Sequence, residues 1–208
     1  ARSVTVEAVN DPLVIGATTT TPLVAVEGAA AVTLAPTLSV TDPDATGVVS
    51  ARVTIASGFK AGSDVLALSG QAPTISAAFD AQTGVMTLTG AATVEDYQAA
   101  IRAITFANTS DAPGNGVRRV MLELTDVEGL VQRADLAQVQ TEGRVDAPVV
   151  DLNGANAAGN GAQGTFVAGL HSKGLVLAPR AQILDVDSTT LRRLTLTIDE
   201  DGRQTGDQ

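Results

Sequence analysis

Hydrophobic and polar residues alternate along much of the chain, and this alternation predicts short β-strands. The clearest stretches are residues 49–56, 119–124 and 193–198, in which every second residue is Val, Ala, Leu or Ile. Period-two spacing places alternate side chains on opposite faces of a strand, so one face is expected to be buried. Weaker patterns predict further strands near residues 13–16, 22–26, 31–41, 65–68, 74–79, 85–89, 103–107 and 131–141.

Turn signals separate these predicted strands. The segment Asp80–Gly84 (DAQTG) is typical of a hairpin turn, because Gly tolerates the positive φ that such turns require. Many short strands at intervals of about 8–12 residues indicate an all-β sandwich in which each sheet buries one face.

One segment has helical rather than strand spacing. Thr93 is a suitable N-cap for Val94–Ile101, and the first turn carries acidic residues that favour the helix dipole. Val94, Tyr97 and Ile101 recur at spacings of three and four residues, which places them on one face. We therefore expect a two-turn helix between two strands. The aromatic residues Phe59, Phe79, Tyr97 and Phe106 are expected in the core of this region, with Phe166 as a lone later anchor.

Composition narrows the classes of function. The 208 residues contain 13 Lys and Arg against 23 Asp and Glu, which gives a net charge of −10. Nucleic acids and anionic membrane surfaces attract basic proteins, so neither is an expected partner. The absence of Cys excludes disulfides, Cys-ligated zinc and thiol catalysis. No run of about 18 apolar residues is present, so direct membrane insertion is not expected.

Aspartates gather in the predicted turns and strand ends. A single Asp at such a position is explained by turn capping, because its carboxylate hydrogen-bonds the nearby backbone. Two close pairs, Asp42 with Asp44 and Asp185 with Asp187, fit this explanation less well, because neighbouring carboxylates repel unless a cation lies between them. Ca²⁺ takes about six to eight oxygen ligands and accepts irregular loop geometry. The pairs therefore indicate Ca²⁺, with turn capping as the alternative.

The chain also repeats itself. Residues 32–55 match residues 175–198 without a gap at an offset of 143, which places Asp42 on Asp185 and Asp44 on Asp187. Upstream, residues 4–12 match residues 139–148 at an offset of about 135, which places Asp11 on Asp146. Two matches in the same order indicate a tandem array.

The repeat register predicts the domain organisation. Residues 1–10 are interpreted as the last strand of a preceding repeat, residues 11–145 as one complete repeat, and residues 146–208 as the first half of a second, truncated repeat. Half a sandwich exposes strand edges and an apolar face. We therefore expect residues beyond about 146 to pair with another chain, to be disordered, or to belong to a longer protein.

Several segments in this order resemble the long cadherin-like repeats of giant bacterial surface proteins and type I-secreted, RTX-type adhesins. The matching segments are VAVEGAAAVTLAP, VTDPDAT, SARVTI, GFKAGSD, FDAQTGVMTLTG, ATVEDYQAAIRAITFANTSD, LTDVEG and AVNDP. The resemblance covers nearly the whole chain. It implies an all-β fold of cadherin/Ig-like β-sandwich repeats with one short helix per repeat, stiffened by Ca²⁺.

The resemblance also implies a set of metal ligands. In the first repeat they are Asn10, Asp11, Glu27, Asp42, Asp44 and Asp126, and in the second they are Asp146, Asp185 and Asp187. The second repeat departs from the pattern, because Leu170 stands where the first has Glu27 and its linker reads RVDAP. A site there is therefore less well supported.

These observations favour a non-enzymatic structural or adhesion module, with calcium binding, at the cell surface or secreted. The expected partners are neighbouring repeats of the same or another chain, and a possible cell-surface or matrix ligand. One alternative is a carbohydrate- or protein-binding adhesin tip, although a tip usually diverges from its spacers. A secreted glycoside hydrolase is disfavoured by the scarcity of aromatic residues. A Ser-His-Asp triad would depend on His171, the only histidine, which the complete repeat lacks.

Overall fold

The protein forms two compact units that meet between Arg144 and Val145. The computed structural model describes residues 3–4, 7, 9–44, 47–70, 72–154, 161–162 and 175–197. The boundary lies within one residue of the junction expected between positions 145 and 146. That the two units are repeats of one array stays a prediction.

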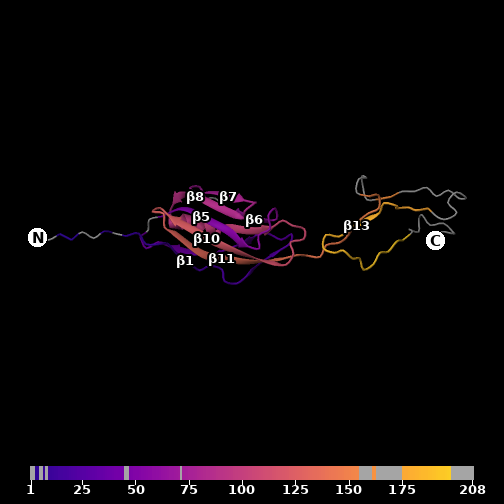
Figure 1. Ribbon diagram of the computed structural model, residues 1–208, viewed down its shortest axis with the longest axis horizontal. Coiled ribbons are helices and arrows are strands. Elements are labelled where there is room, and N and C mark those ends of the chain that lie inside the picture. Colours follow the sequence, from indigo (N-terminus) through magenta and orange to yellow (C-terminus); the bar gives the residue numbers. More distant parts are fainter. Residues whose placement is uncertain are drawn as a thin grey trace. The chain divides into compact units, whose positions relative to one another are not determined.

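The first unit consists of β-strands and one short helix (Figure 1), which confirms the all-β prediction. Its strands are β1 (Val14–Gly16), β2 (Leu23–Val26), β3 (Val32–Thr33), β4 (Ser39–Thr41), β5 (Val48–Ser57), β6 (Asp64–Leu68), β7 (Ser76–Asp80), β8 (Val85–Ala92), β9 (Ile104–Asn108), β10 (Gly116–Asp126) and β11 (Val131–Glu142).

These strands make three sheets. The largest has six strands in the order β2-β11-β10-β5-β8-β7, and the others are β3-β9-β6 and the pair β1-β4. All pairings are antiparallel except that of β2 with β11, in which Val139 pairs with Leu23 and Glu142 with Val26. Because β2 runs beside β11 in the same direction, the residues that follow both strands come together at one end of the unit.

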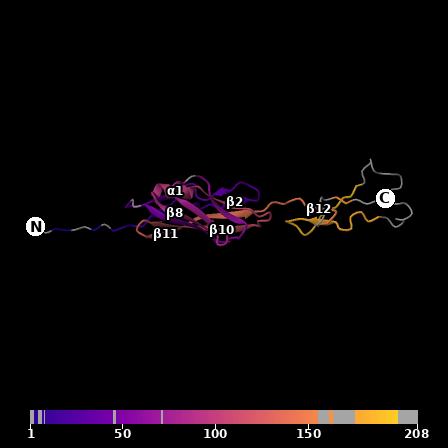
Figure 2. The same cartoon turned by 90° about the horizontal axis from the view of Figure 1, so that it is seen from above.

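The helix α1 (Val94–Arg102) lies between β8 and β9 in the chain, and Figure 2 shows it above β8. It begins as expected: the Thr93 hydroxyl accepts from the backbone N–H of Asp96, and the Asp96 carboxylate accepts from the N–H of Thr93. This reciprocal capping box satisfies two backbone donors that the helix itself leaves unpaired. The buried face includes Val94, Tyr97 and Ile101, as the spacing predicted.

One hydrophobic core joins the sheets and the helix. Tyr97 and Phe106 are fully buried in it, while Phe59 and Phe79 are partly buried against it, so the prediction of an aromatic contribution is confirmed. Phe166 lies outside the described residues. The inward apolar residues of β10 are Val120, Leu122 and Leu124, and each is at most 1% exposed. The alternation of apolar and polar residues in β10 therefore corresponds to one buried and one more exposed face of the strand.

The turn between β7 and β8 also forms as expected. The backbone N–H of Gly84 donates to the Asp80 carbonyl, and Gly84 adopts a positive φ of 71°. A Cβ atom at this position would lie 2.8 Å from the ring of Phe59, so the turn excludes a side chain on steric as well as conformational grounds.

Three details differ from the sequence-based expectation. The predicted strand over 31–41 is two strands, β3 and β4, because a turn in which Leu38 donates to the Ala35 carbonyl interrupts it. In β5 the pairing register shifts between Val48 and Ser50, so Val48 is buried and Val49 is only half-buried. Residues 193–197 have no strand, although the alternation predicted one; Ile198 lies outside the described residues.

The second unit contains one strand pair among its described residues, β12 (Val149–Asp151) with β13 (Gln182–Leu184). They are antiparallel, with Val149 opposite Leu184 and Asp151 opposite Gln182. Within the portions of both units that the structure describes, no helix is long and apolar enough to cross a membrane.

Candidate metal centre

The first group of predicted ligands lies where the chain enters the first unit. Asp11 precedes β1, and Asp42 and Asp44 follow β4, so the antiparallel β1-β4 pair brings them to the same end. The backbone N–H of Asp11 donates to Oδ2 of Asp44 at 2.6 Å, and the N–H of Asp44 donates to Oδ1 of Asp42 at 2.9 Å. Two hydrogen bonds, each from a backbone N–H to a carboxylate, thus link the three aspartates.

Asn10 and Asp126 extend this group. The side-chain amide Nδ2 of Asn10 donates to Oδ2 of Asp126 at 2.8 Å. Asp126 ends β10 and is fully buried, and its Oδ1 accepts from the backbone N–H groups of Glu128 and Leu130. The Oδ1 atom of Asn10 is buried without a hydrogen-bond partner. Because Asn10 and Asp11 are adjacent, five of the six ligands predicted for the first repeat lie at this end, and we call them the entry cluster: Asn10, Asp11, Asp42, Asp44 and Asp126.

The entry cluster is held together mainly by backbone donors. In the described residues, no three of its carboxylate groups offer oxygen atoms that all lie within 4.8 Å of one another. The carboxylates are therefore gathered at one end of the unit, but they do not close around a single point. Movements of exposed side chains such as Asp11 and Asp44 would be required to form a full coordination shell.

Glu27 lies elsewhere. It follows β2, which runs parallel to the last residues of β11, whereas Asp126 precedes the start of β11. A strand of 12 residues separates these ends, which corresponds to roughly 35 Å. Glu27 therefore cannot share an ion with Asp42 and Asp44, so the ligands implied for the first repeat do not form one site.

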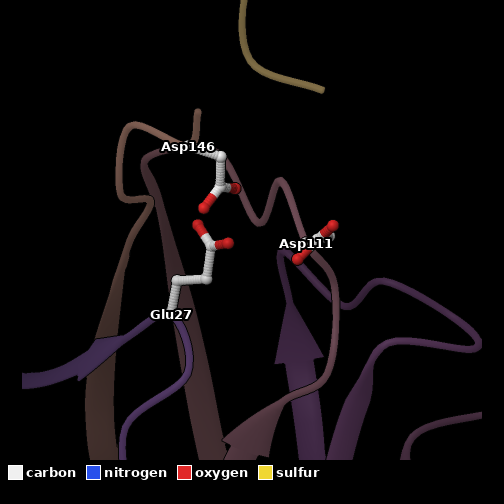
Figure 3. Close-up of side chains that lie close together, drawn as sticks. All are labelled: Glu27, Asp111 and Asp146. Carbon is white, nitrogen blue, oxygen red and sulfur yellow. The ribbon is translucent and has the colours of Figure 1, made fainter. Parts of the chain in front are cut away.

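Glu27 has its own surroundings at the exit of the first unit. Glu27 is buried, with an exposed fraction of 8%. Its Oε2 atom accepts a hydrogen bond from the backbone N–H of Arg144 at 2.8 Å. A carboxylate oxygen of Asp111 lies within 4.8 Å of one of Glu27 (Figure 3). Asp111 comes from the loop between β9 and β10. We call Glu27 and Asp111 the exit pair. Figure 3 also draws Asp146, the second residue of the next unit.

Asp111 was not among the predicted ligands. It is one of the aspartates that the sequence pattern places in turns or at strand ends, and only the FANTSD segment of the resemblance pointed to that loop as a recurring feature. Two close carboxylates with one of them buried raise the free energy of the folded protein unless a cation or a shared proton compensates. Among the described residues, no Lys or Arg forms an ion pair with Glu27, Asp111 or Asp126.

The second unit repeats the bonding of the first. The N–H of Asp146 donates to Oδ2 of Asp187 at 2.7 Å, and the N–H of Asp187 donates to Oδ1 of Asp185 at 3.0 Å. These are the atoms and directions of the bonds that join Asp11, Asp44 and Asp42. The strand registers agree as well, because β12-β13 pairs the residues equivalent to those of β1-β4 at offsets of 135 and 143.

The second unit differs in its linker residue. Val145 stands at the position of Asn10, and it is 93% exposed. A valine has no side-chain oxygen or nitrogen, so it cannot make the contact that Asn10 makes with Asp126. His171 and Leu170, which the sequence comparison singled out, lie outside the described residues.

The acidic residue with the strongest partner lies away from both groups. Asp64 is fully buried, and it accepts from Arg118 Nε at 3.0 Å, from Asn108 Nδ2 at 2.6 Å and from the backbone N–H of Lys60 at 2.7 Å. Asp64 is one of the aspartates that the sequence pattern places in a turn or at a strand end. The sequence did contain a signal for this pair. Arg118 lies two residues before Val120 in β10, so the two side chains point to the same, inward face of the sheet. This ion pair ties the 58–64 loop to the sheet.

Comparison with known proteins adds no assignment. A scan against models of protein families, a search of curated proteins and a search of solved structures found no match to this chain.

Proposed function

We propose that this chain is a non-enzymatic, calcium-binding structural or adhesion module of a large extracellular bacterial surface protein. Its units would be cadherin-like, Ig-like β-sandwiches in tandem, and Ca²⁺ would stiffen the loops and linkers at their ends. The observation that carries the proposal is the recurrence of one hydrogen-bonded aspartate arrangement at the start of both units.

The recurrence supports a tandem array because it extends beyond the aspartates. In the first unit the N–H of Leu38 donates to the Ala35 carbonyl, and at the same offset the N–H of Ala181 donates to the Ala178 carbonyl. Shared turns, strand registers and side-chain bonds over these segments are most simply explained by one structural unit used twice.

The chemistry of the two groups supports Ca²⁺. The entry cluster offers four carboxylates and an amide oxygen, Oδ1 of Asn10, which is buried without a hydrogen-bond partner. The exit pair offers a buried carboxylate and an exposed one. Oxygen ligands of this kind suit hard cations, and Ca²⁺ tolerates the irregular geometry of loops. The location of these groups at the ends of the unit suits a cation that stiffens a linker.

Two pockets on the first unit do not favour the glycosidase alternative. An open pocket of about 420 Å³ is lined by Phe59, Lys60, Ala61, Ser63, Asn108, Ser110, Ala112 and Pro113, and none of these is acidic. A smaller pocket of about 160 Å³ contains one acid, Glu123, which is paired with Arg133. Glycoside hydrolysis usually requires two carboxylates on either side of the scissile bond.

Thermal unfolding with and without Ca²⁺ tests the proposal. At a Ca²⁺ concentration of about 100 times Kd, binding to the folded form adds about 2.7 kcal/mol to the unfolding free energy. For a unit of this size we expect EDTA to lower Tm by roughly 5–15 °C. The double variant Asp42→Ala with Asp44→Ala should abolish most of the calcium-dependent increase.

The matched control removes two acids from another surface. Glu123→Ala with Asp135→Ala deletes carboxylates that form exposed ion pairs on β10 and β11, and it should leave the calcium-dependent increase in Tm intact. A melting curve of the unmodified chain that is the same in EDTA and in millimolar-range Ca²⁺ would contradict the proposal.

A further inference from the structure

The second unit exposes several large apolar side chains. Leu177 is 61% exposed, Leu191 44%, Leu194 59% and Leu196 84%. Among the described residues of this unit, no hydrophobic side chain reaches the burial of the core in the first unit. Solvent exposure of several neighbouring leucines costs free energy, and such a surface commonly marks a place where other chain segments bind.

The equivalent positions in the first unit are buried. At the offset of 143, the four exposed leucines fall on residues that are at most 1% exposed: Leu34, Val48, Ala51 and Val53. The same sequence pattern is thus fully buried in one unit and open in the other. The turn that follows Leu34 and Leu177 is the same in both units, as are the strand pairs β1-β4 and β12-β13. The units differ beyond these elements, because residues 48–57 form a strand and residues 191–197 do not.

The segment that covers these positions in the first unit is known. Val53 pairs with Met86 of β8 on one side and with Leu122 of β10 on the other, and Ala51 pairs with Leu88 and Leu124. Leu34 donates its N–H to the carbonyl of Ile104 at the start of β9. The cover therefore comes from Val85–Asp126, which comprises β8, α1, β9 and β10.

The spacing of the exposed leucines matches the spacing of the buried residues in β5. In β5 the register shift at Val48 lets Val48 and Ala51, three residues apart, both be buried. In the second unit Leu191 and Leu194 are also three residues apart, and Leu196 follows at the two-residue spacing of Val53. An ordinary alternating strand would place Leu191 and Leu194 on opposite faces. The leucines therefore match a bulged strand that is buried between two neighbours.

We propose that residues 175–197 are a docking surface for a polypeptide segment with the strand and helix order of Val85–Asp126. Residues 191–197 become a strand between the partner's equivalents of β8 and β10, and the exposed leucines enter a shared core. The occupant is thus a complementary half of the same fold. This inference rests on the tandem repeat in the proposed function, because the equivalent positions are taken at the offset of 143, and it does not depend on Ca²⁺ binding.

The test supplies such a segment in place of residues 201–208. A second copy of residues 58–144 is joined after Glu200, and amide hydrogen exchange of residues 191–197 is compared with that of the original chain. We expect exchange to slow by on the order of 100-fold or more, because exposed backbone becomes an interior strand. Trypsin cleavage after Arg192 and Arg193 should slow in parallel.

Two variants keep the result interpretable. In the first, Leu194→Asp with Leu196→Asp in the extended chain should restore fast exchange, while the first unit keeps its own protection. In the second, Leu194→Ala with Leu196→Val gives the extended chain the residues that occupy these positions beside the original segment, which removes any mismatch in volume.

The proposal is overturned if residues 191–197 exchange as fast in both the extended chain and this volume-matched chain as they do in the original. It is also overturned if protection arises in the original chain as its concentration increases. The Val85–Asp126 segment of a second copy is already paired within that copy's first unit, so the occupant would then be another surface of the second copy.

Discussion

The two units share their first structural elements and differ in what covers them. Asp11–Gly16 with Ser39–Asp44, and Asp146–Asp151 with Gln182–Asp187, have equivalent strand registers and equivalent hydrogen bonds. Yet Val53 is fully buried and its counterpart Leu196 is 84% exposed. Local hydrogen bonds can therefore form without a core, whereas burial and the β5-type strand require β8 and β10 on either side.

The largest expected effect is the loss of the buried ion pair, which belongs to the first unit. Asp64→Ala leaves Arg118 buried without its carboxylate, and the unfolding free energy should fall by about 3–5 kcal/mol. Urea denaturation followed by circular dichroism measures the change. Asp135→Ala removes the exposed partner of Arg119 and should cost no more than about 1 kcal/mol. Equal losses in the two variants would show that burial does not govern the strength of these pairs.

The next prediction compares equivalent leucines directly. Leu34→Ala creates a cavity in the core and should destabilise the first unit by about 2–5 kcal/mol. Leu177→Ala removes a side chain that is 61% exposed and should change the unfolding free energy by less than about 0.5 kcal/mol. Both are measured by the same urea titration. A large effect of Leu177→Ala would mean that this side chain is buried in solution.

The linker residue distinguishes the aspartate groups of the two units. Asn10→Val gives the entry cluster the residue that stands at the start of the second unit, and removes an amide oxygen from the proposed ligands. We expect calorimetry to show weaker Ca²⁺ binding by about tenfold, equivalent to about 1.4 kcal/mol. The exposed Thr20→Val is a control of similar chemistry. Unchanged affinity in Asn10→Val would remove Asn10 from the ligand set.

The smallest effect uses the only tyrosine of the chain, which reports on the first unit alone. Burial raises the pKa of the Tyr97 hydroxyl, which donates to the Gly90 carbonyl at 2.7 Å. Because the folded-state pKa lies above the unfolded value of about 10, this contribution to stability is complete below that pH and is lost as pH rises through the folded-state pKa.

Tyr97→Phe should therefore lower the unfolding free energy by about 1 kcal/mol at neutral pH, through the lost hydrogen bond. It should also remove part of the alkaline destabilisation. Urea titrations of both proteins at neutral pH and above about pH 10 measure this difference. The same alkaline loss in both proteins would show that Tyr97 does not contribute to it.

The features that were predictable from sequence depend on neighbours in the chain. The helix needed only the capping residues Thr93 and Asp96 and a spacing of three and four for its buried face. The turn at Asp80–Gly84 needed only a residue that tolerates positive φ. The aspartate pairs were visible as pairs because a single residue separates Asp42 from Asp44 and Asp185 from Asp187.

The features that were not predictable depend on residues far apart in the chain. Glu27 and Asp111 are 84 positions apart and come together only because β2 runs parallel to β11 beside the β9-β10 loop. The sequence pattern marks Asp64 only as an aspartate of a turn or strand end and does not single out Arg118, although inward strand parity places both in the interior. Both side chains are charged, so they were not recognised as inward positions in the period-two pattern that the apolar residues define.

The sequence by itself thus determined the all-β class, the helix, most strand positions and the acidic turns, because period-two spacing, capping and turn residues act over a few residues. Only the tertiary structure decided which acids gather at each end of the first unit and which leucines are buried. The physical reason is that a strand is completed by its neighbours: residues 48–57 form β5 between β8 and β10, whereas the equivalent alternation at 191–197 has no strand.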